Sequence, residues 1–302
     1  MQFLKYLFST LILICYSCIA QEVSFCPTVL NGVQNVLTSP FGGQKAKLSD
    51  HKYNVYSQFG EDGIIERIFS IMGTTSKIAI EFGGADGFSC SNTANLWTKD
   101  WKGFLVEAAP HLFEQLSSNV ARYDCIPIYR KIDVFGENTI ESLAKEYNMG
   151  AAIDLLSIDV DGDDYYIFQT MQNLRPRLII CEFNPSIPAH LDIYSDYGHH
   201  IGCSVAALER IALEKGYTLV ALTDANCFFV VNEEYPKFAN YDTDPKHLFT
   251  DRYIAYVISD YSGNYKVIGP EKFVHPWGWS GHSSIDDCHG DVVTIPATIK
   301  ME

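Results

Sequence analysis

The chain has 302 residues, of which 47% are hydrophobic and 20% are charged, so it is long and apolar enough to bury a substantial core. That composition excludes an intrinsically disordered chain. The formal net charge is −15, and no cluster of Lys and Arg stands out along the sequence. Because nucleic-acid binding depends on neutralising phosphates, this charge balance argues against DNA or RNA as the main partner.

Residues 1–20 have the pattern of a targeting segment. Lys5 precedes the apolar run 6–15, and Cys18-Ile19-Ala20 supplies small residues before the expected cleavage site. This pattern predicts a secretory signal peptide, which places the mature protein in the secretory pathway or another extracytoplasmic compartment. An uncleaved signal-anchor is the alternative, since 3–20 is nearly long enough to span a bilayer. A membrane is expected as a partner only in that case.

Residues 21–52 are polar and rich in turn formers, which predicts an irregular lead-in to an α/β domain over 53–232. The domain begins with a helix that the stretch Tyr56–Gly63 opens and Gly73 ends. Its apolar residues recur at spacings of three and four, as expected for one buried face. They are Ile64, Ile65, Ile68, Phe69 and Met72.

Strands and helices then alternate along the chain. Alternation at this spacing indicates βαβ units, hence a parallel sheet covered on both faces. The predicted strands are Ile78–Phe82, Gly103–Glu107, Cys125–Tyr129, Ile153–Ile158 and Arg177–Phe183. The predicted helical segments between them are Ser91–Trp97, Pro110–Ala121, Asn138–Tyr147 and Tyr165–Asn173.

The pattern changes after Asn184. The stretch 185–203 has little periodicity, and a loop of this length beside strand ends is usually functional. A helix over Ser204–Lys215 follows, and then two strands joined by a link so short that they must pair antiparallel. These strands are Tyr217–Leu222 and Cys227–Val231. Residues 233–302 are expected to form a C-terminal extension packed on the core, with one strand at Tyr253–Ile258.

Acidic residues follow the strand ends. Ligands of open α/β sheets bind at the carboxyl ends of the strands, and five acidic residues in register there predict a site. They stand at or just beyond the ends of the first five strands. They are Glu81, Glu107, Asp133, Asp159 and Glu182.

The glycine turn after the first strand indicates which ligand to expect. The turn Gly83-Gly84-Ala85-Asp86-Gly87 departs from the G-x-G-x-x-G pattern that receives a pyrophosphate, and Asp86 would repel a phosphate. Glu107 lies twenty residues after Gly87, the spacing expected for a carboxylate that holds ribose hydroxyls. A cationic, phosphate-free nucleoside therefore fits best, and S-adenosylmethionine is such a ligand.

Several stretches resemble FkbM-type S-adenosylmethionine-dependent methyltransferases. They are Tyr56–Gly63, Glu81–Gly87, Asp154–Gly162, Glu182-Phe183-Asn184 and the hairpin ending Asn226–Val230, and the resemblance covers roughly Tyr56–Val231. It implies a class I methyltransferase fold, a Rossmann-like, seven-stranded, mostly parallel sheet with helices on both faces and an antiparallel final hairpin. It also implies O-methylation of a hydroxyl on a sugar or other small molecule.

The resemblance also implies roles for individual residues. The stretch from Glu81 to Gly87 would cradle the methionine part of the cofactor, Glu107 would bind the ribose, and Asp133 would lie near the adenine. The implied cofactor contacts are Glu81, Gly83, Gly84, Asp86, Gly87, Glu107, Asp133 and Asp159.

Asp159 and Asp161 are expected beside the methyl group, and one of them is the predicted catalytic base. A helix-capping turn is the structural alternative at Asp161. Metal binding is a further possibility, because Asp159 or Asp161 with Glu182 and Asn184 would offer the hard oxygen ligands that Mg²⁺ or Mn²⁺ accepts. The predicted substrate contacts are Glu182, Asn184, His199 and His200, although the two histidines would also suit a solvated loop.

Two other functions stay open from the sequence. One is a glycosyltransferase in which Asp159-Val160-Asp161 holds a metal and a nucleotide sugar. It fits a secretory compartment, whereas S-adenosylmethionine would need a transporter to reach one. The other is a binding module that has kept the fold and lost the reaction. The acceptor is expected to be a small molecule or a glycan.

Overall fold

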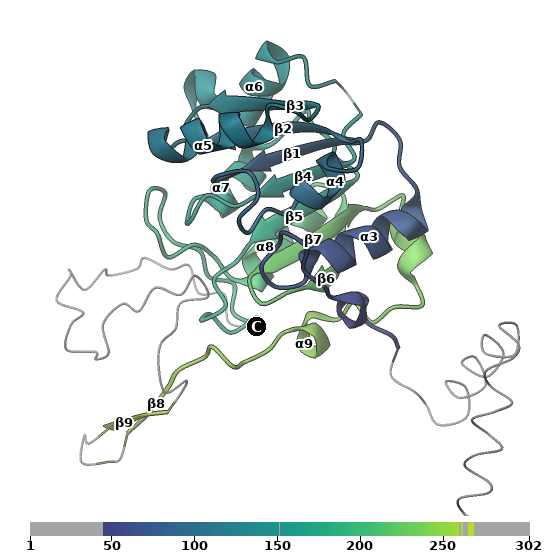
Figure 1. Cartoon of the computed structure of the whole chain (residues 1–302). Helices are drawn as coiled ribbons and strands as arrows, with labels where there is room; N and C mark the ends of the chain where they lie inside the picture. Colours follow the sequence, from purple (N-terminus) through teal and green to yellow (C-terminus); the bar gives the residue numbers. More distant parts are fainter. Residues whose placement is uncertain (1–44, 151, 260, 262–264, 269–302) are drawn as a thin grey trace, which may run out of the picture. The chain divides into compact units, whose positions relative to one another are not determined.

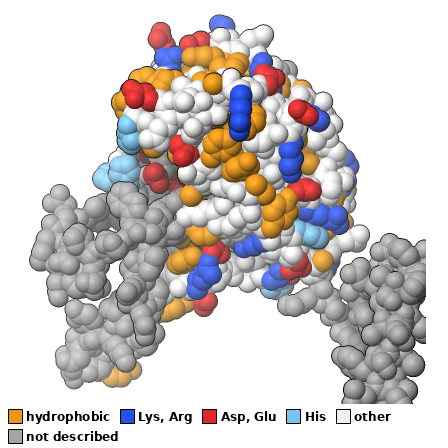
Figure 2. All heavy atoms as spheres, viewed as in Figure 1, with side chains coloured by type: hydrophobic (Ala, Val, Ile, Leu, Met, Phe, Trp, Pro, Cys, Tyr) orange, Lys and Arg blue, Asp and Glu red, His pale blue; other side chains and the backbone are white. Residues whose placement is uncertain are grey.

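A computed structural model describes residues 45–150, 152–259, 261 and 265–268 (Figure 1). The predicted signal segment 1–20, most of the predicted lead-in and the end of the predicted extension, 269–302, lie outside the described residues. Among the described helices, none is long and apolar enough to cross a bilayer. On the face that Figure 2 shows, Lys and Arg side chains are dispersed among acidic and neutral ones.

A seven-stranded sheet with the order β3-β2-β1-β4-β5-β7-β6 forms the centre of the domain. Neighbouring strands from β3 to β5 are parallel, and β7 runs antiparallel to both β5 and β6. This is the predicted class I methyltransferase arrangement, reversed final strand included. The strands are β1 (Ile78–Phe82), β2 (Lys102–Glu107), β3 (Cys125–Tyr129), β4 (Leu155–Ile158), β5 (Leu178–Glu182), β6 (Tyr217–Leu222) and β7 (Asn226–Val231).

Helices cover both faces of the sheet because its strands are apolar on both sides (Figure 1). One core includes side chains of α3 (Glu61–Met72), α4 (Ala94–Trp97) and α5 (Pro110–Val120). The other includes side chains of α6 (Ile140–Glu146), α7 (Asp164–Thr170) and α8 (Val205–Glu214). Successive residues of β1 alternate between them, with Ala79 in the first core and Ile80 in the second.

The strand order has one switch point. From β1 the chain moves through β2 to β3 on one side, and then returns to place β4 and β5 on the other side. Loops that leave β1 and β4 therefore diverge, and the crevice between them is where open α/β sheets bind ligands. The predicted acidic residues follow these strand ends.

Some element boundaries differ from the prediction. The helix expected over Ser91–Trp97 begins only at Ala94, because Ser91 and Thr93 turn their hydroxyls to Glu81 instead. Helix α7 ends at Thr170 and not at Asn173, since Met171 is already extended. The late strand β8 (Tyr256–Ser259) begins three residues after Tyr253 and pairs with β9 (Tyr265–Ile268), which was not predicted.

The segment after β7 packs on the core in its first part. It contains η3 (Tyr235–Phe238) and α9 (Pro245–Leu248), and Phe238 is fully buried. Leu248 and Phe249 pack against the core, and Ile254 is buried. A short 3-10 helix, η1 (Leu48–His51), precedes α3, and another, η2 (Gly136–Asn138), precedes α6.

Candidate functional site

The turn after β1 lies directly against the segment after β4. Gly83 has φ +77°, and a Cβ there would lie 1.8 Å from the backbone oxygen of Asp159. Only glycine fits such a position without displacing backbone. The N–H groups of Gly83 and Gly84 both donate to the Val106 carbonyl, at 3.1 and 3.0 Å. The ends of β1, β2 and β4 are thereby fixed to one another.

Glu107 joins the loops that follow β1 and β2. Its side chain is buried, with Oε2 accepting from Ala85 N at 2.9 Å and Oε1 accepting from Ala109 N at 2.6 Å. A carboxylate oxygen has two lone pairs, so each oxygen keeps one after these bonds. Glu107 is therefore held rigidly and can still accept two hydroxyl donors, as its predicted ribose contact requires.

Glu81 has a different role from the predicted one. It is 3% exposed and accepts from the Ser91 and Thr93 hydroxyls at 2.7 and 2.6 Å and from Asn92 N at 2.7 Å. Burial raises the pKa of Glu81, and these three bonds oppose the shift. The geometry thus favours a structural role, in which Glu81 anchors the segment before α4, over direct contact with a cofactor.

Asp86 is also used within its own turn. Its Oδ1 accepts from Phe88 N at 2.9 Å and from Ser89 N at 2.7 Å, and its Oδ2 accepts from the Ser89 hydroxyl. Burial raises the pKa of Asp86, but these bonds outweigh it and leave the pKa below its ordinary value. Like Glu81, Asp86 shapes its loop, and its cofactor contact stays a prediction.

Asp133 lies four residues beyond the end of β3, on the way to α6. Its Oδ1 accepts from Val134 N and from the Tyr197 hydroxyl, both at 2.7 Å. The bond from Tyr197 is the main cause of a lowered pKa of Asp133. Tyr197 belongs to the predicted functional loop 185–203, which therefore reaches the position predicted to lie near the adenine.

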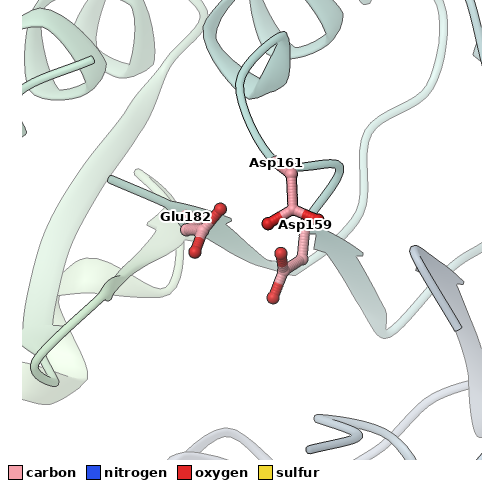
Figure 3. A group of neighbouring side chains, drawn as sticks. All are labelled: Asp159, Asp161 and Glu182. Carbon is pink, nitrogen blue, oxygen red and sulfur yellow. The ribbon is translucent and has the colours of Figure 1, made fainter. Parts of the chain in front are cut away.

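Three of the predicted acidic residues form a cluster at two adjoining strand ends. Each of Asp159, Asp161 and Glu182 offers one carboxylate oxygen, and these oxygens lie within 4.8 Å of one another (Figure 3). Asp161 is exposed, whereas Asp159 and Glu182 are half-buried.

The cluster changes the protonation of its own members. Burial, followed by the charges of nearby acidic residues, raises the pKa values of Asp159 and Glu182 well above their ordinary range. A hydrogen bond between their two carboxyl groups raises the pKa of Glu182 and lowers that of Asp159. Both carboxyl groups therefore hold a proton more readily than an isolated carboxyl group does.

Asn184 makes its side-chain hydrogen bonds within its own loop. Its Nδ2 donates to the Ile201 carbonyl at 2.8 Å, and its Oδ1 accepts from the backbone N and the hydroxyl of Ser186 at 2.9 and 2.6 Å. An amide oxygen has two lone pairs, and both are used here. This geometry favours a role in shaping the 185–203 loop over the predicted roles as metal ligand and substrate contact.

His199 and His200 lie over the turn after β4. Both are exposed, and His200 Nδ1 is 2.8 Å from the backbone oxygen of Asp161. Gly162 has φ +138°, and a Cβ there would lie 2.9 Å from the His199 backbone oxygen. The two histidines are therefore at the rim of the acidic cluster, where a substrate contact is possible, and are not simply solvated.

Glu61 is a part of the site that sequence analysis missed. It is fully buried, and its Oε1 accepts from the Thr223 hydroxyl at 2.7 Å and from Asn226 Nδ2 at 3.2 Å. Asn226 is directly opposite Glu182 in the β5–β7 register. The start of α3 is thus joined to the hairpin beside the cluster. Glu61 stood in the quoted Tyr56–Gly63 stretch, but its partners lie far away in the sequence.

Asp164 was also missed. It is 2% exposed, and it accepts from Val160 N at 2.8 Å and from Gly162 N at 2.9 Å. Burial raises its pKa to about 6, against the effect of these bonds. Asp164 is the first residue of α7, and its side chain accepts from the turn before the helix and not from the helix itself, so the sequence carried no capping signal for this role.

Comparisons with known proteins bear on the fold. No family model matches the chain, and no curated protein sequence does. Its solved structural neighbours include an S-adenosylmethionine-dependent methyltransferase from Clostridium acetobutylicum, with 10% identity, 67% of this chain and 99% of that chain covered, and a TM-score of 0.39.

Two further neighbours were solved with S-adenosylmethionine bound. One is magnesium protoporphyrin IX methyltransferase from Synechocystis, with 11% identity, 57% of this chain and 77% of that chain covered, and a TM-score of 0.37. The other is an amino pentose methyltransferase from Micromonospora echinaspora, with 10% identity, 56% of this chain and 89% of that chain covered, and a TM-score of 0.37. Similarity at this level says nothing about the chemistry of the site. The strand order and the reversed β7 are what give this chain the class I methyltransferase fold.

Proposed function

We propose that the protein is an S-adenosylmethionine-dependent methyltransferase that acts on a hydroxyl group. The observation that carries this proposal is the position of Glu107. It is held by Ala85 N and Ala109 N on the loops after β1 and β2, and it keeps one lone pair on each oxygen for a pair of neighbouring hydroxyls. A ribose presents such a pair.

The surroundings of the turn after β1 support the same cofactor. Gly83 lies against Asp159, so the methionine part would lie beside the acidic cluster. Carboxylates favour the sulfonium and ammonium charges of this cofactor through simple Coulomb attraction. Asp133 would lie on the adenine side, with Tyr197 next to it.

Methyl transfer is an in-line displacement, so much of the rate enhancement comes from holding the acceptor oxygen against the methyl group. A base that removes the hydroxyl proton adds about 10²–10⁴-fold. We assign that role to Asp159, because it lies against the Gly83 turn, where the methionine part and its methyl group would lie. The new C–O bond forms as the S–CH₃ bond breaks, the proton goes to Asp159, and the products are a methyl ether and S-adenosylhomocysteine.

The same cluster fits a divalent cation. Three carboxylates with mutually close oxygens are the hard ligands that Mg²⁺ and Mn²⁺ prefer. Asp159, Asp161 and Glu182 would hold the ion, and Asn184 would not. When bound, the ion would act as a Lewis acid on the acceptor hydroxyl. The residues would then orient the acceptor and exclude water.

The acceptor we propose is a hydroxyl of a sugar or another small molecule in a secretory compartment. The 185–203 loop supports an acceptor contact at the cluster, since His200 lies against Asp161 and the His199 backbone lies against Gly162. The glycosyltransferase alternative would use Asp159 and Asp161 as well, but it leaves the paired loop contacts of Glu107 unexplained.

Calorimetry on the purified chain tests the proposal. S-adenosylmethionine or S-adenosylhomocysteine should bind, and Glu107→Ala should abolish binding. Glu114→Ala, on the exposed side of α5, removes the same charge and should leave binding unchanged. Binding of a nucleotide sugar with Mn²⁺, and of neither S-adenosyl compound, would overturn the proposal. Binding without turnover of any hydroxyl acceptor would favour the inactive module.

A further inference from the structure

The turn that carries Asp159 and Asp161 has an unfavourable backbone. Asp161 has φ +59° and Gly162 has φ +138°, so two consecutive residues lie outside the ordinary range for L-amino acids. At a non-glycine residue such as Asp161 this costs on the order of 1 kcal/mol. Something outside the turn must therefore hold it in this conformation.

Asp164 stabilises the 160–162 turn from its buried side. It is the first residue of α7, it is buried, and each of its oxygens accepts one backbone N–H of the turn, from Val160 at 2.8 Å and from Gly162 at 2.9 Å. Hydrogen bonds to a charged group are about twice as strong as neutral ones. The two bonds straddle Asp161 and set the direction in which its side chain points.

The 185–203 loop holds the turn from the outside. Gly162 packs against the backbone of His199 and His200, and Asp163 Oδ1 accepts from Gly198 N at 2.8 Å. The turn is thus enclosed on two sides. Asp164 itself is outside the group of mutually close carboxylate oxygens, which among the described residues consists of Asp159, Asp161 and Glu182.

We propose that Asp164 is a positioning residue, whose buried carboxylate holds the 160–162 backbone so that Asp159 and Asp161 meet Glu182. It touches neither acceptor nor cofactor and acts through the two aspartates. This inference rests on the proposed function for its effect on turnover. The conformation of the turn can be measured without any activity.

The test is Asp164→Asn in the full chain. An asparagine side chain has one oxygen, so it can accept from only one of the two N–H groups and turns its own NH₂ toward the other. Hydrogen exchange of the peptide covering 159–163 should become at least about tenfold faster. With a hydroxyl acceptor, kcat should fall about 10- to 100-fold, with KM and the affinity for S-adenosylhomocysteine within about threefold of wild type.

Asp163→Asn is the matched control. It removes the neighbouring charge but keeps an Oδ1 that can still accept from Gly198 N, so the loop contact remains and exchange of Val160 and Gly162 should be unchanged. Asp164→Glu keeps the charge but displaces it by one methylene group, and it decides the question if Asp164→Asn fails to fold. Melting temperature accompanies each measurement, because a purely structural residue would lower it without lowering kcat of the folded enzyme.

Two results would overturn the inference. One is unchanged exchange at 159–163 in folded Asp164→Asn and Asp164→Glu. The other is faster exchange with unchanged kcat. If the wild-type chain binds no S-adenosyl compound, the proposed function fails, while the exchange data still decide whether Asp164 holds the turn.

Discussion

Strand β4 has an aspartate at each end, and the two are in opposite environments. Asp154, just before the strand, is fully buried, and its oxygens accept from the Arg177 guanidinium and from Thr75, Ser76 and Lys77. Burial raises its pKa, but the bond from Arg177 and those from the 75–77 segment outweigh burial and lower it. Asp159, just after the strand, faces other carboxyl groups, and its pKa is raised.

The difference shows what separates a structural carboxylate from a functional one in this fold. Both aspartates flank the same buried strand, but Asp154 is fully buried and Asp159 is half-buried. Their polar neighbours separate them further. Asp154 has cationic and N–H partners for its oxygens and stabilises the fold, whereas Asp159 lies beside the carboxyl groups of Asp161 and Glu182, a setting suited to holding a proton, a cation or an acceptor.

Asp159→Asn should give the largest effect, and on turnover only. The amide cannot take the acceptor proton, so kcat should fall about 10²–10⁴-fold. Removing a negative charge from the cluster relieves repulsion, so the free energy of unfolding should stay equal or rise. Steady-state kinetics and urea denaturation on the same preparation check both statements. Unchanged turnover would remove Asp159 from the mechanism.

Asp154→Asn should show the reverse. It breaks a buried ion pair with Arg177, so the free energy of unfolding should fall by about 3–5 kcal/mol. Affinity of the folded fraction for the cofactor should be unchanged, because Asp154 is at the opposite end of β4. Denaturation curves and calorimetry measure the two quantities. A loss of affinity with wild-type stability would contradict the contrast between the two ends.

Gly83→Ala should disturb only the carboxyl end of β4, where Asp159 lies, and not the end where Asp154 lies. Its Cβ would collide with the Asp159 backbone oxygen at a position where φ is positive, so we expect about 3 kcal/mol of destabilisation and loss of cofactor binding. Gly84→Ala is the matched variant, since its Cβ would lie 3.6 Å from its nearest neighbours. It should cost less than about 1 kcal/mol. Equal effects in the two variants would argue against the close approach of Gly83 to Asp159.

The contributions of the two ends of β4 to stability should also depend on pH in opposite directions. The lowered pKa of Asp154 gives stability that is present above the unfolded value of about 4 and is lost as pH falls through the folded pKa. The raised pKa values of Asp159 and Glu182 give stability that is present below about 4 and is lost as pH rises through their folded values.

Glu182→Gln should therefore flatten the loss of stability at higher pH, by about 1.4 kcal/mol for each pH unit by which a pKa returns to normal. The loss of stability at low pH, which comes from Asp154, should not change. Urea midpoints across the pH range measure both losses. If Glu182→Gln changed only the loss at low pH, the carboxyl groups of the cluster would not be the raised ones.

The sequence was sufficient for the direction of the strands, because apolar runs, glycine turns and a short hairpin link are local signals. The class I arrangement of the sheet was expected only from the resemblance to FkbM-type methyltransferases. The sequence was also sufficient to bring Asp159, Asp161 and Glu182 together, since parallel strands end at one edge. It could not separate Asp154 from Asp159, because the donors to Asp154 come from 75–77 and Arg177, which are distant in sequence.

The same limit explains the other misses. Glu81 and Asn184 follow their strands as ligand residues would, but their donors and acceptors belong to loops whose paths are set by tertiary packing. Strand β9 pairs with β8 alone, in a region without an alternating pattern. Asp164 was missed for a different reason, because its side chain accepts from the turn before its own helix, which no capping pattern in the sequence indicates.

The bond from Asn226 to Glu61 links residues 165 positions apart, and this has a consequence for how the protein is made. During translation at about 5–20 residues per second, Glu61 emerges roughly 10–30 seconds before Asn226. Until the last hairpin is synthesised, the carboxylate at the start of α3 lacks these two partners and resists burial. The site should therefore be completed last. A ribosome stalled before β7 should hold a chain in which the β1 turn has formed but the hairpin strand beside Glu182 is missing.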